Sequence, residues 1–217
     1  MVTLQLEEKT SKGLKVLCLG AHSDDIEIGC GGTILKLIQQ YPDAEFYWVV
    51  FGAAGVREHE ALSSANVFLK QASRKKIITK AFRDGFFPSN TTAIKEFFEE
   101  IKREFSPTLV LTHYRDDRHQ DHRVISDLTW NTFRDHLIWE YEIIKYDGDL
   151  GSPNLFVKLD DELCKRKIQY LMDGFATQRS KHWFTEDTFF SMLRIRGIES
   201  AGAGRYAEGF YSRKIIL

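Results

Sequence analysis

Short apolar segments alternate with amphipathic segments along the first two thirds of the chain. The apolar segments have the length of buried strands and lie at residues 15–21, 45–52, 76–82 and 108–113. The amphipathic segments predict helices and lie at residues 33–40, 57–72, 92–105 and 121–135. Strands that alternate with helices predict right-handed crossovers and a mostly parallel sheet covered on both faces, so we expect an α/β fold.

The last third of the chain has a less regular pattern. It predicts further strands at residues 140–145, 154–159 and 210–217. It also predicts one more helix, at residues 160–172. Residues 196–209 are rich in glycine and show no period, so we expect a long loop there. That loop has two interpretations, an ordinary surface loop and a substrate lid, and the first is favoured. No repeat or linker interrupts the sequence, so residues 1–217 are expected to form a single domain.

The charge balance of the chain argues against some classes of binding partner. The chain carries 30 Lys and Arg against 31 Asp and Glu, a formal net charge of −1, which argues against binding to nucleic acid or to an anionic membrane surface. No apolar run approaches the roughly 18 residues of a membrane span, and the N-terminus is acidic where a signal peptide is basic and then apolar. We therefore expect a cytoplasmic protein that acts on a small molecule, with a homo-oligomer left open. The three cysteines include no CxxC pair and are expected to be buried free thiols.

Two loops carry residues of the types that bind metals. The sequence AHSDD (21–25) directly follows the first strand, and HYRDDRHQDH (113–122) begins where the strand at 108–113 ends. Ligands of α/β sheets bind beyond the carboxyl ends of the strands, and both loops open on the same edge of the sheet. We therefore expect the two loops to meet in space.

Together the two loops contain the donors of a catalytic metal site. Zinc takes imidazole nitrogens and carboxylate oxygens, and a catalytic site has three protein ligands with one position left for water. His22 and Asp25, three residues apart on a tight turn, and His122 near a helix start can supply these ligands. Asp24 is then placed to accept a proton from the water, and His119 to donate to an oxyanion or to protonate a leaving amine.

These motifs resemble those of the PIG-L/LmbE-like metal-dependent N-deacetylases. The first motif of that family reads approximately Pro or Ala, then H-x-D-D-x-E, followed by a Gly-rich turn and a helix; the second reads approximately H-x-D-H. AHSDDIEIGCGGTI and DRHQDH match them, and the similarity continues in REHEA (57–61) and in a K-x-x-x-L…Q pattern between Lys167 and Gln178. The two motifs at this separation are specific, whereas either alone is weak.

The resemblance implies a fold, a cofactor and a reaction. The fold would be a Rossmann-like three-layer sandwich, and the cofactor a divalent ion, usually zinc. The reaction would be hydrolysis of the acetyl amide of an amino sugar, often N-acetylglucosamine within a larger glycoside. By motif position, His22, Asp25 and His122 would be the metal ligands. Asp24 would be the general base, and His119 would stabilise the oxyanion or assist the leaving group. The two-His, one-carboxylate set accepts zinc, Fe²⁺ or another divalent ion, so the metal stays open.

The resemblance also bears on three further positions. Arg57 would contact a sugar hydroxyl, although a charged first helical turn explains it equally well. Gln120 and Ala21 stand where the family often has Pro. That difference changes the stiffness of the two turns rather than the chemistry.

Other residues near the motifs have more than one interpretation. Asp121 is interpreted as a helix N-cap with an outer bond to a ligand histidine, and Glu27 as holding the loop or orienting a ligand. The roles of His113 and Asp117 stay open. The GCGG run (29–32) lacks the G-x-G-x-x-G spacing of a nucleotide loop, so it is interpreted as room for the chain to turn into a helix.

The leading hypothesis is a zinc-dependent N-deacetylase, and it has two rivals. One is a non-catalytic sugar or nucleotide-sugar binding module on the same fold. The intact ligand set argues against it, because a binding module need not retain a base beside an open metal site. The other is a metal-dependent hydrolase of a different amide. Only a panel of substrates distinguishes it from the deacetylase, because metal ligands do not determine the leaving group.

Overall fold

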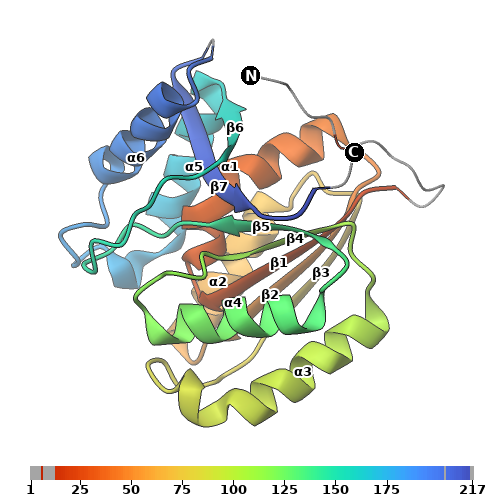
Figure 1. Cartoon of the computed structure of the whole chain (residues 1–217). Coiled ribbons are helices and arrows are strands. Elements are labelled where there is room, and N and C mark those ends of the chain that lie inside the picture. Colours follow the sequence, from red (N-terminus) through yellow and green to blue (C-terminus); the bar gives the residue numbers. More distant parts are fainter. Residues whose placement is uncertain (1–5, 7–12, 203, 216–217) are drawn as a thin grey trace.

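A seven-stranded sheet runs through the described part of the chain, in the strand order β3-β2-β1-β4-β5-β7-β6 (Figure 1). The computed structural model describes residue 6, residues 13–202 and residues 204–215. The strands are β1 (Lys15–His22), β2 (Glu45–Gly52), β3 (Arg74–Thr79), β4 (Leu109–His113), β5 (Leu137–Tyr141), β6 (Leu155–Leu159) and β7 (Tyr206–Ser212). Strands β1 to β5 pair in parallel, whereas β7 is antiparallel to both β5 and β6. The expected α/β class with a mostly parallel sheet is confirmed, and the order β3-β2-β1-β4-β5 is compatible with a Rossmann-like arrangement.

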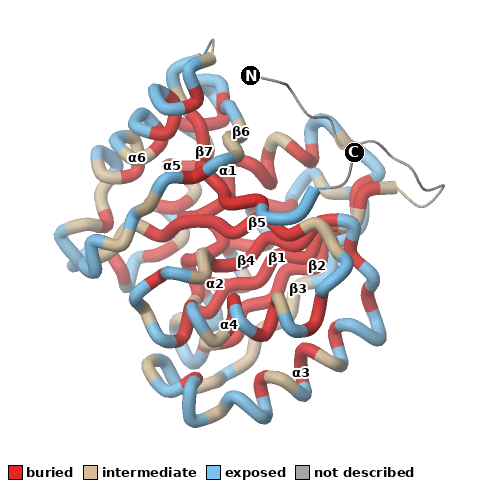
Figure 2. The backbone as a smooth tube through the Cα atoms, in the orientation of Figure 1, coloured by how far each residue is buried: buried red, intermediate tan, exposed pale blue. Residues whose placement is uncertain are grey.

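Helices cover both faces of the sheet. They are α1 (Asp25–Gln40), α2 (Val56–Phe68), α3 (Thr91–Glu104), α4 (Gln120–Thr132), α5 (Asp161–Gly174) and α6 (Glu186–Glu199), with short 3₁₀ turns η1 (Phe87–Asn90) and η2 (Ala176–Gln178). Helices α3 and α4 pack on one face and the others on the opposite face (Figure 1). Because side chains alternate along a strand, Val16 and Cys18 enter one core while Leu17 and Leu19 enter the other. The inner strands are therefore buried along most of their length (Figure 2).

Among the described residues, no helix is both long enough and apolar enough to cross a bilayer.

The expectation of a long loop at residues 196–209 is wrong. The first of these residues complete α6, and from Tyr206 the chain forms β7, which lies inside the sheet between β5 and β6. Such a strand cannot act as a substrate lid. The glycines that suggested a loop serve close packing instead: a Cβ at Gly197 would overlap the backbone of Arg205, and one at Gly209 would lie 2.8 Å from Pro153. Helix α6, which the sequence pattern does not indicate, has little amphipathic character because its buried face includes Arg196 and Gly197 while Ile195 and Ile198 are exposed.

Two strand positions also differ from the sequence pattern. Strand β5 covers Leu137–Tyr141, where residues 140–145 are predicted, because the apolar residues that continue the pattern belong to the segment after the strand. Strand β7 ends at Ser212, where the sequence predicts a strand over 210–217, and residues 216 and 217 lie outside the described residues. The helix predicted at 160–172 is confirmed as α5, with the side chain of Asp160 accepting from the Leu163 amide at the N-cap.

The GCGG run lies inside α1 and not before it. The helix begins at Asp25, and Cys30 interrupts it with non-helical dihedrals (φ −144°, ψ 15°). Glycine is required there because neighbouring elements approach the backbone closely: a Cβ at Gly29 would overlap the ring of Tyr141, and one at Gly31 would lie 2.6 Å from Phe68. The run therefore allows α1 to pack tightly against β5 and α2.

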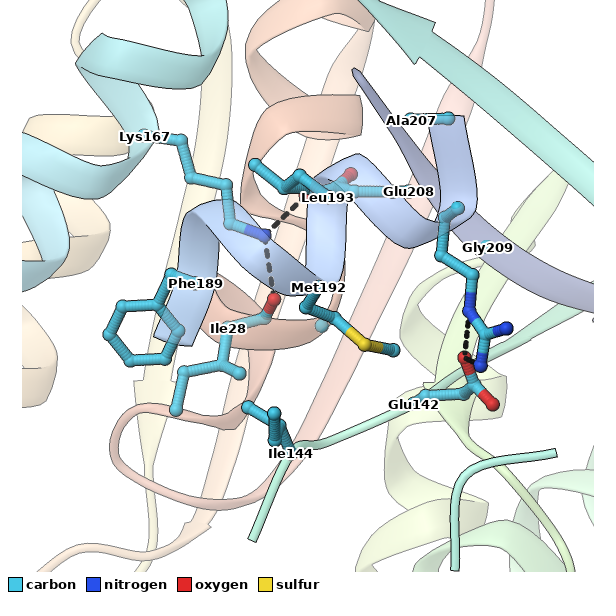
Figure 3. Close-up of a pocket in the computed structure, with 12 residues that line it drawn as sticks. Ile28, Glu142, Ile144, Lys167, Phe189, Met192, Leu193, Ala207, Glu208 and Gly209 are labelled. Atoms are coloured by element: carbon cyan, nitrogen blue, oxygen red, sulfur yellow. Dashed lines mark hydrogen bonds and ion pairs between the residues drawn. The ribbon is translucent and has the colours of Figure 1, made fainter. Parts of the chain in front are cut away.

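A buried ion pair satisfies the backbone groups that this interruption leaves free. The carboxylate of Glu208 accepts from the amides of Gly32 at 2.8 Å and Thr33 at 2.6 Å. Lys167 Nζ lies 2.6 Å from both Glu208 Oε1 and the carbonyl of Ile28 (Figure 3). Free donors and acceptors inside a core are costly, so this pair stabilises the bend at Cys30 and ties β7 and α5 to the helix that carries the first motif.

We expect Gly29→Ala to destabilise the protein by about 1–3 kcal/mol, because overpacking of a filled core outweighs the better helix propensity of alanine. The measurement is urea denaturation followed by circular dichroism. Gly174→Ala in α5 is the matched control, since a Cβ there meets Ser64 at an ordinary 3.5 Å. Equal midpoints for both variants and the natural protein would contradict the close approach of Tyr141.

Candidate metal centre

The two motifs meet where the direction of the helical connections changes. Strand β1 leads into α1 on one face, and its neighbour β4 leads into α4 on the other face, which is where α/β sheets bind ligands. His22 ends β1 and His122 lies in the first turn of α4. Their facing nitrogens, His22 Nδ1 and His122 Nε2, are 3.1 Å apart although the residues are 100 positions apart in sequence. The structure therefore brings the two predicted loops together.

Three donor atoms converge at this point. Asp25 Oδ2 lies 3.4 Å from His22 Nδ1 and 3.5 Å from His122 Nε2. In a tetrahedral zinc site with bonds of about 2.0–2.1 Å, neighbouring donors are about 3.3–3.4 Å apart. The spacing of the three atoms fits an ion of that size, and a tetrahedral ion would keep one position free of protein donors.

On both imidazole rings, carboxylates contact the nitrogen that is not one of the three converging donors. His122 Nδ1 lies 2.9 Å from Asp117 Oδ2. His22 Nε2 lies 3.1 Å from Asp84 Oδ1 and 3.3 Å from Asp121 Oδ2. A carboxylate on the outer nitrogen keeps the proton there and leaves the inner nitrogen available to a metal. This arrangement on both histidines is typical of metal ligands.

Negative charge exceeds positive charge at the site. The carboxylates there are Asp24, Asp25, Asp84, Asp117 and Asp121. Among the described residues, the lysine and arginine side chains paired with them are Arg57, on Asp24, and Lys145, on Asp117. All of these carboxylates except Asp84 are buried, and a buried excess of carboxylate favours a bound cation.

The histidine pKa values respond to this charge. Burial alone would lower the pKa of His22, but Asp25 and the hydrogen bonds to Asp121 and Asp84 hold it well above its usual value. Burial and the neighbouring His113 lower the pKa of His122 to about 3. Without a metal, a proton on His22 therefore offsets part of the carboxylate charge, and a divalent cation would take its place.

Asp24 lies beside the three donors and is held by a different partner. It is the N-cap residue of α1, is 5% exposed, and its Oδ1 accepts from Arg57 Nη2 at 2.7 Å. Burial raises the pKa of the Asp24 carboxyl, and Arg57 offsets part of that rise. Arg57 also donates to Thr177 Oγ1 at 3.1 Å. The contact between Arg57 and the predicted base is one that the sequence does not indicate.

His119 is the N-cap residue of α4. Its Nδ1 accepts from the Asp121 amide at 3.3 Å, which leaves the ring proton on Nε2. The ring centroid lies 4.8 Å from that of His22 and 4.6 Å from that of His122. Burial and the charge on His22 lower the pKa of His119, so it is a neutral N–H donor beside the three donor atoms.

Asp121 is not the N-cap that the sequence suggests, because His119 holds that position. Its carboxylate instead accepts from two amides of the loop after β3, Gly85 at 2.6 Å and Phe87 at 3.1 Å. It also lies 3.3 Å from Nε2 of His22, a histidine of the first motif; whether His22 binds a metal stays a prediction. Asp121 thus fastens the loop that carries Asp84, a residue that sequence reasoning missed although its loop follows the carboxyl end of a parallel strand.

His113 is close to the donors but its lone pair is occupied. Its Nε2 accepts from the Ala21 amide at 2.9 Å while lying 3.2 Å from Asp25 Oδ2. The fully buried ring stacks on His122 at 4.0 Å between centroids. We therefore assign His113 to the support of the site rather than to the ligand set.

Glu27 is completely buried, and burial raises the pKa of its carboxyl to about 8. Within the part of the chain that the structure describes, neither carboxyl oxygen has a hydrogen-bond partner. Its expected role in orienting a ligand stays a prediction.

The sequence matches a known protein family over the same region. The model of the PIG-L family, described as GlcNAc-PI de-N-acetylase, matches residues 17–133, a range that includes both motifs and every donor described above.

Several solved structures are similar to this one. The N,N'-diacetylchitobiose deacetylase of Pyrococcus horikoshii is 22% identical, with 93% of this chain and 84% of that chain covered and a TM-score of 0.69. The zinc-inhibited form of a teicoplanin deacetylase is 17% identical, with coverage of 91% and 97% and a TM-score of 0.71. The 4-carboxy-2-hydroxymuconate hydratase of Pseudomonas putida is also 17% identical, with coverage of 94% and 98% and a TM-score of 0.71. These likenesses show the fold, and the fold hosts more than one reaction.

Proposed function

The chain belongs to the PIG-L family, and on that premise we propose that it is a metal-dependent hydrolase that removes the acetyl group from an N-acetylated amino sugar. The observation that carries this proposal is the convergence of His22 Nδ1, His122 Nε2 and Asp25 Oδ2, all within 3.5 Å of one another, with Asp24 next to them. A non-catalytic binding module on the same fold has no need of a base beside an open metal site. The amide substrate follows from the family and from the deacetylases of similar structure.

His22, Asp25 and His122 would hold the ion, which we expect to be zinc or Fe²⁺. A divalent ion bound there would polarise the amide carbonyl and make water a nucleophile near neutral pH. Asp117 and the pair Asp84 and Asp121 keep the outer protons of the two imidazoles in place. These contacts orient the imidazole rings of His22 and His122, because neither ring can rotate without losing them.

Asp24 is the proposed general base. It accepts a proton as the water oxygen bonds to the acetyl carbon, and Arg57 holds the carboxylate in place through the 2.7 Å contact with Oδ1. His119 donates a hydrogen bond from Nε2 to the oxygen that gains charge or to the departing nitrogen. Asp24 passes the proton that it accepted to the departing nitrogen, and breakage of the C–N bond then yields acetate and a free amine.

Arg57 has a second proposed role. Its side chain is 26% exposed, and its two terminal nitrogens already contact Asp24 and Thr177. We infer that the exposed edge of the guanidinium contacts a sugar hydroxyl, which would link substrate binding to the placement of the base.

A substrate panel tests the proposed function. Zinc-loaded protein is incubated with N-acetylglucosamine glycosides, N-acetylated nucleotide sugars and lipid-linked N-acetyl sugars, and acetate and free amine are measured together. We expect equal amounts of both products from at least one sugar class. Hydrolysis of another acyl amide, with no turnover of any N-acetylated sugar, would support the rival amide hydrolase. Sugar binding that chelators do not affect, without turnover of any panel member, would instead support the binding module.

A further inference from the structure

The segment after β5 is held firmly at its base. Glu142 is buried and pairs with Arg196 at 2.7 Å, and Figure 3 shows Glu142 at this contact. The same carboxylate accepts from the Gly151 amide and from the Tyr211 hydroxyl, both at 2.9 Å. Ile143 then packs into the core with 4% of its surface exposed. The residues that follow therefore leave a fixed point and do not belong to a free loop.

Lys145 reaches from this segment to the rear of the proposed metal centre. Its Nζ lies 3.0 Å from Asp117 Oδ2, the same oxygen that lies 2.9 Å from His122 Nδ1. The lysine side chain is 9% exposed and that of Asp117 is 2% exposed. Because water is nearly excluded from both groups, their attraction is only weakly screened.

A second contact ties the same segment to the backbone of the second motif. Lys145 Nζ lies 2.5 Å from Asp149 Oδ2, and that oxygen accepts from the Arg118 amide at 2.7 Å. Asp117 Oδ1 in turn accepts from the His119 amide at 2.7 Å. The peptide between Asp117 and His119 is thus restrained on both sides.

We propose that Lys145 is a positioning residue for the metal ligand His122, acting through Asp117; this inference rests on the proposed metal-dependent function. The ammonium group holds the Asp117 carboxylate in the orientation that accepts the proton of His122 Nδ1. His122 Nε2 then stays directed at Asp25 and His22. If this segment only fastened the loop, the hydrogen bond from the Arg118 amide to Asp149 would suffice. The Lys145 ammonium group instead lies beside Asp117 Oδ2, the oxygen that orients the His122 ring.

The test compares metal affinity among folded variants. Lys145→Met keeps the length of the side chain and removes its charge, and we expect its zinc affinity to fall about 10- to 100-fold, as is typical when an outer partner of a ligand histidine is lost. Affinity is measured by competition with a chromogenic chelator, and the geometry by the visible spectrum of the cobalt-loaded protein, which should change in this variant. Lys145→Arg, which retains the charge, should recover most of the affinity.

Two controls separate positioning from a structural role. Lys70→Met removes an exposed lysine that contacts none of the described residues of the site, and it should leave zinc affinity unchanged. Asp149→Ala removes the acceptor of the Arg118 amide while Lys145 can still reach Asp117, so it should lower thermal stability more than zinc affinity. The inference is overturned if Lys145→Met binds zinc as tightly as the natural protein, or if Asp149→Ala weakens binding equally. Failure of the natural protein itself to bind a divalent ion would instead overturn the proposed function.

Discussion

Replacing Asp24 with asparagine should lower kcat by about 10²- to 10⁴-fold, the range that a positioned general base contributes. Asparagine keeps the shape of the side chain and can still contact Arg57, but it cannot accept a proton at neutral pH. Asp24 is held by Arg57 at 2.7 Å and lies outside the three converging donors, so metal content should not change. The measurement is kcat on the best substrate of the panel together with metal content by elemental analysis.

The matched control for Asp24→Asn is Asp173→Asn, the same substitution at an exposed position of α5. It should leave both kcat and metal content unchanged. An Asp24→Asn protein with full activity would rule out Asp24 as the base. Loss of metal from that variant would mean that Asp24 belongs to the ligand set, which the geometry does not indicate.

Replacing His122 with alanine should abolish stoichiometric metal binding, and activity should be lost with it. The remaining donors would be His22 and Asp25, which is one fewer than a catalytic zinc site uses. The change would also leave Asp117 without the proton that it accepts from His122 Nδ1 at 2.9 Å. Metal content after dialysis against a weak chelator, and acetate release on the same samples, measure both effects.

His59→Ala provides the comparison for His122→Ala, because His59 is exposed on α2 and outside both motifs. It should bind metal and hydrolyse substrate as the natural protein does. If His122→Ala retains one tightly bound ion per chain, the ligand set is wrong, and the neighbouring histidines His119 and His113 become the next candidates.

The meeting of the two motifs could be predicted from sequence because topology alone requires it. AHSDD and DRHQDH each follow a buried apolar run, and the carboxyl ends of parallel strands share one edge of the sheet. The structure places His22 and His122 in contact for that reason. Local residue types then suffice to propose a ligand set, since imidazole nitrogens and carboxylate oxygens are the donors that zinc takes.

Residues that act through tertiary contacts could not be predicted in the same way. Asp84 belongs to a loop with no histidine, and only the fold places it 3.1 Å from His22. Lys145 lies outside both motifs, and Glu208 lies in a segment whose glycines suggested a loop. Glycine is ambiguous in sequence, because the same residue serves a flexible turn and the close approach of two packed elements. For this reason the sequence predicts a turn at 29–32 and a loop at 196–209, whereas the structure has α1 at the first and the end of α6 and β7 at the second.

A zinc titration of metal-free protein, with acetate release from the best N-acetylated sugar of the panel measured in the same samples, tests the central claim most directly. The account predicts that bound zinc and acetate release rise together and level off at a single ion per chain, since His22, Asp25 and His122 converge on one point with the base beside it. Acetate release at the full rate by metal-free protein would contradict the account.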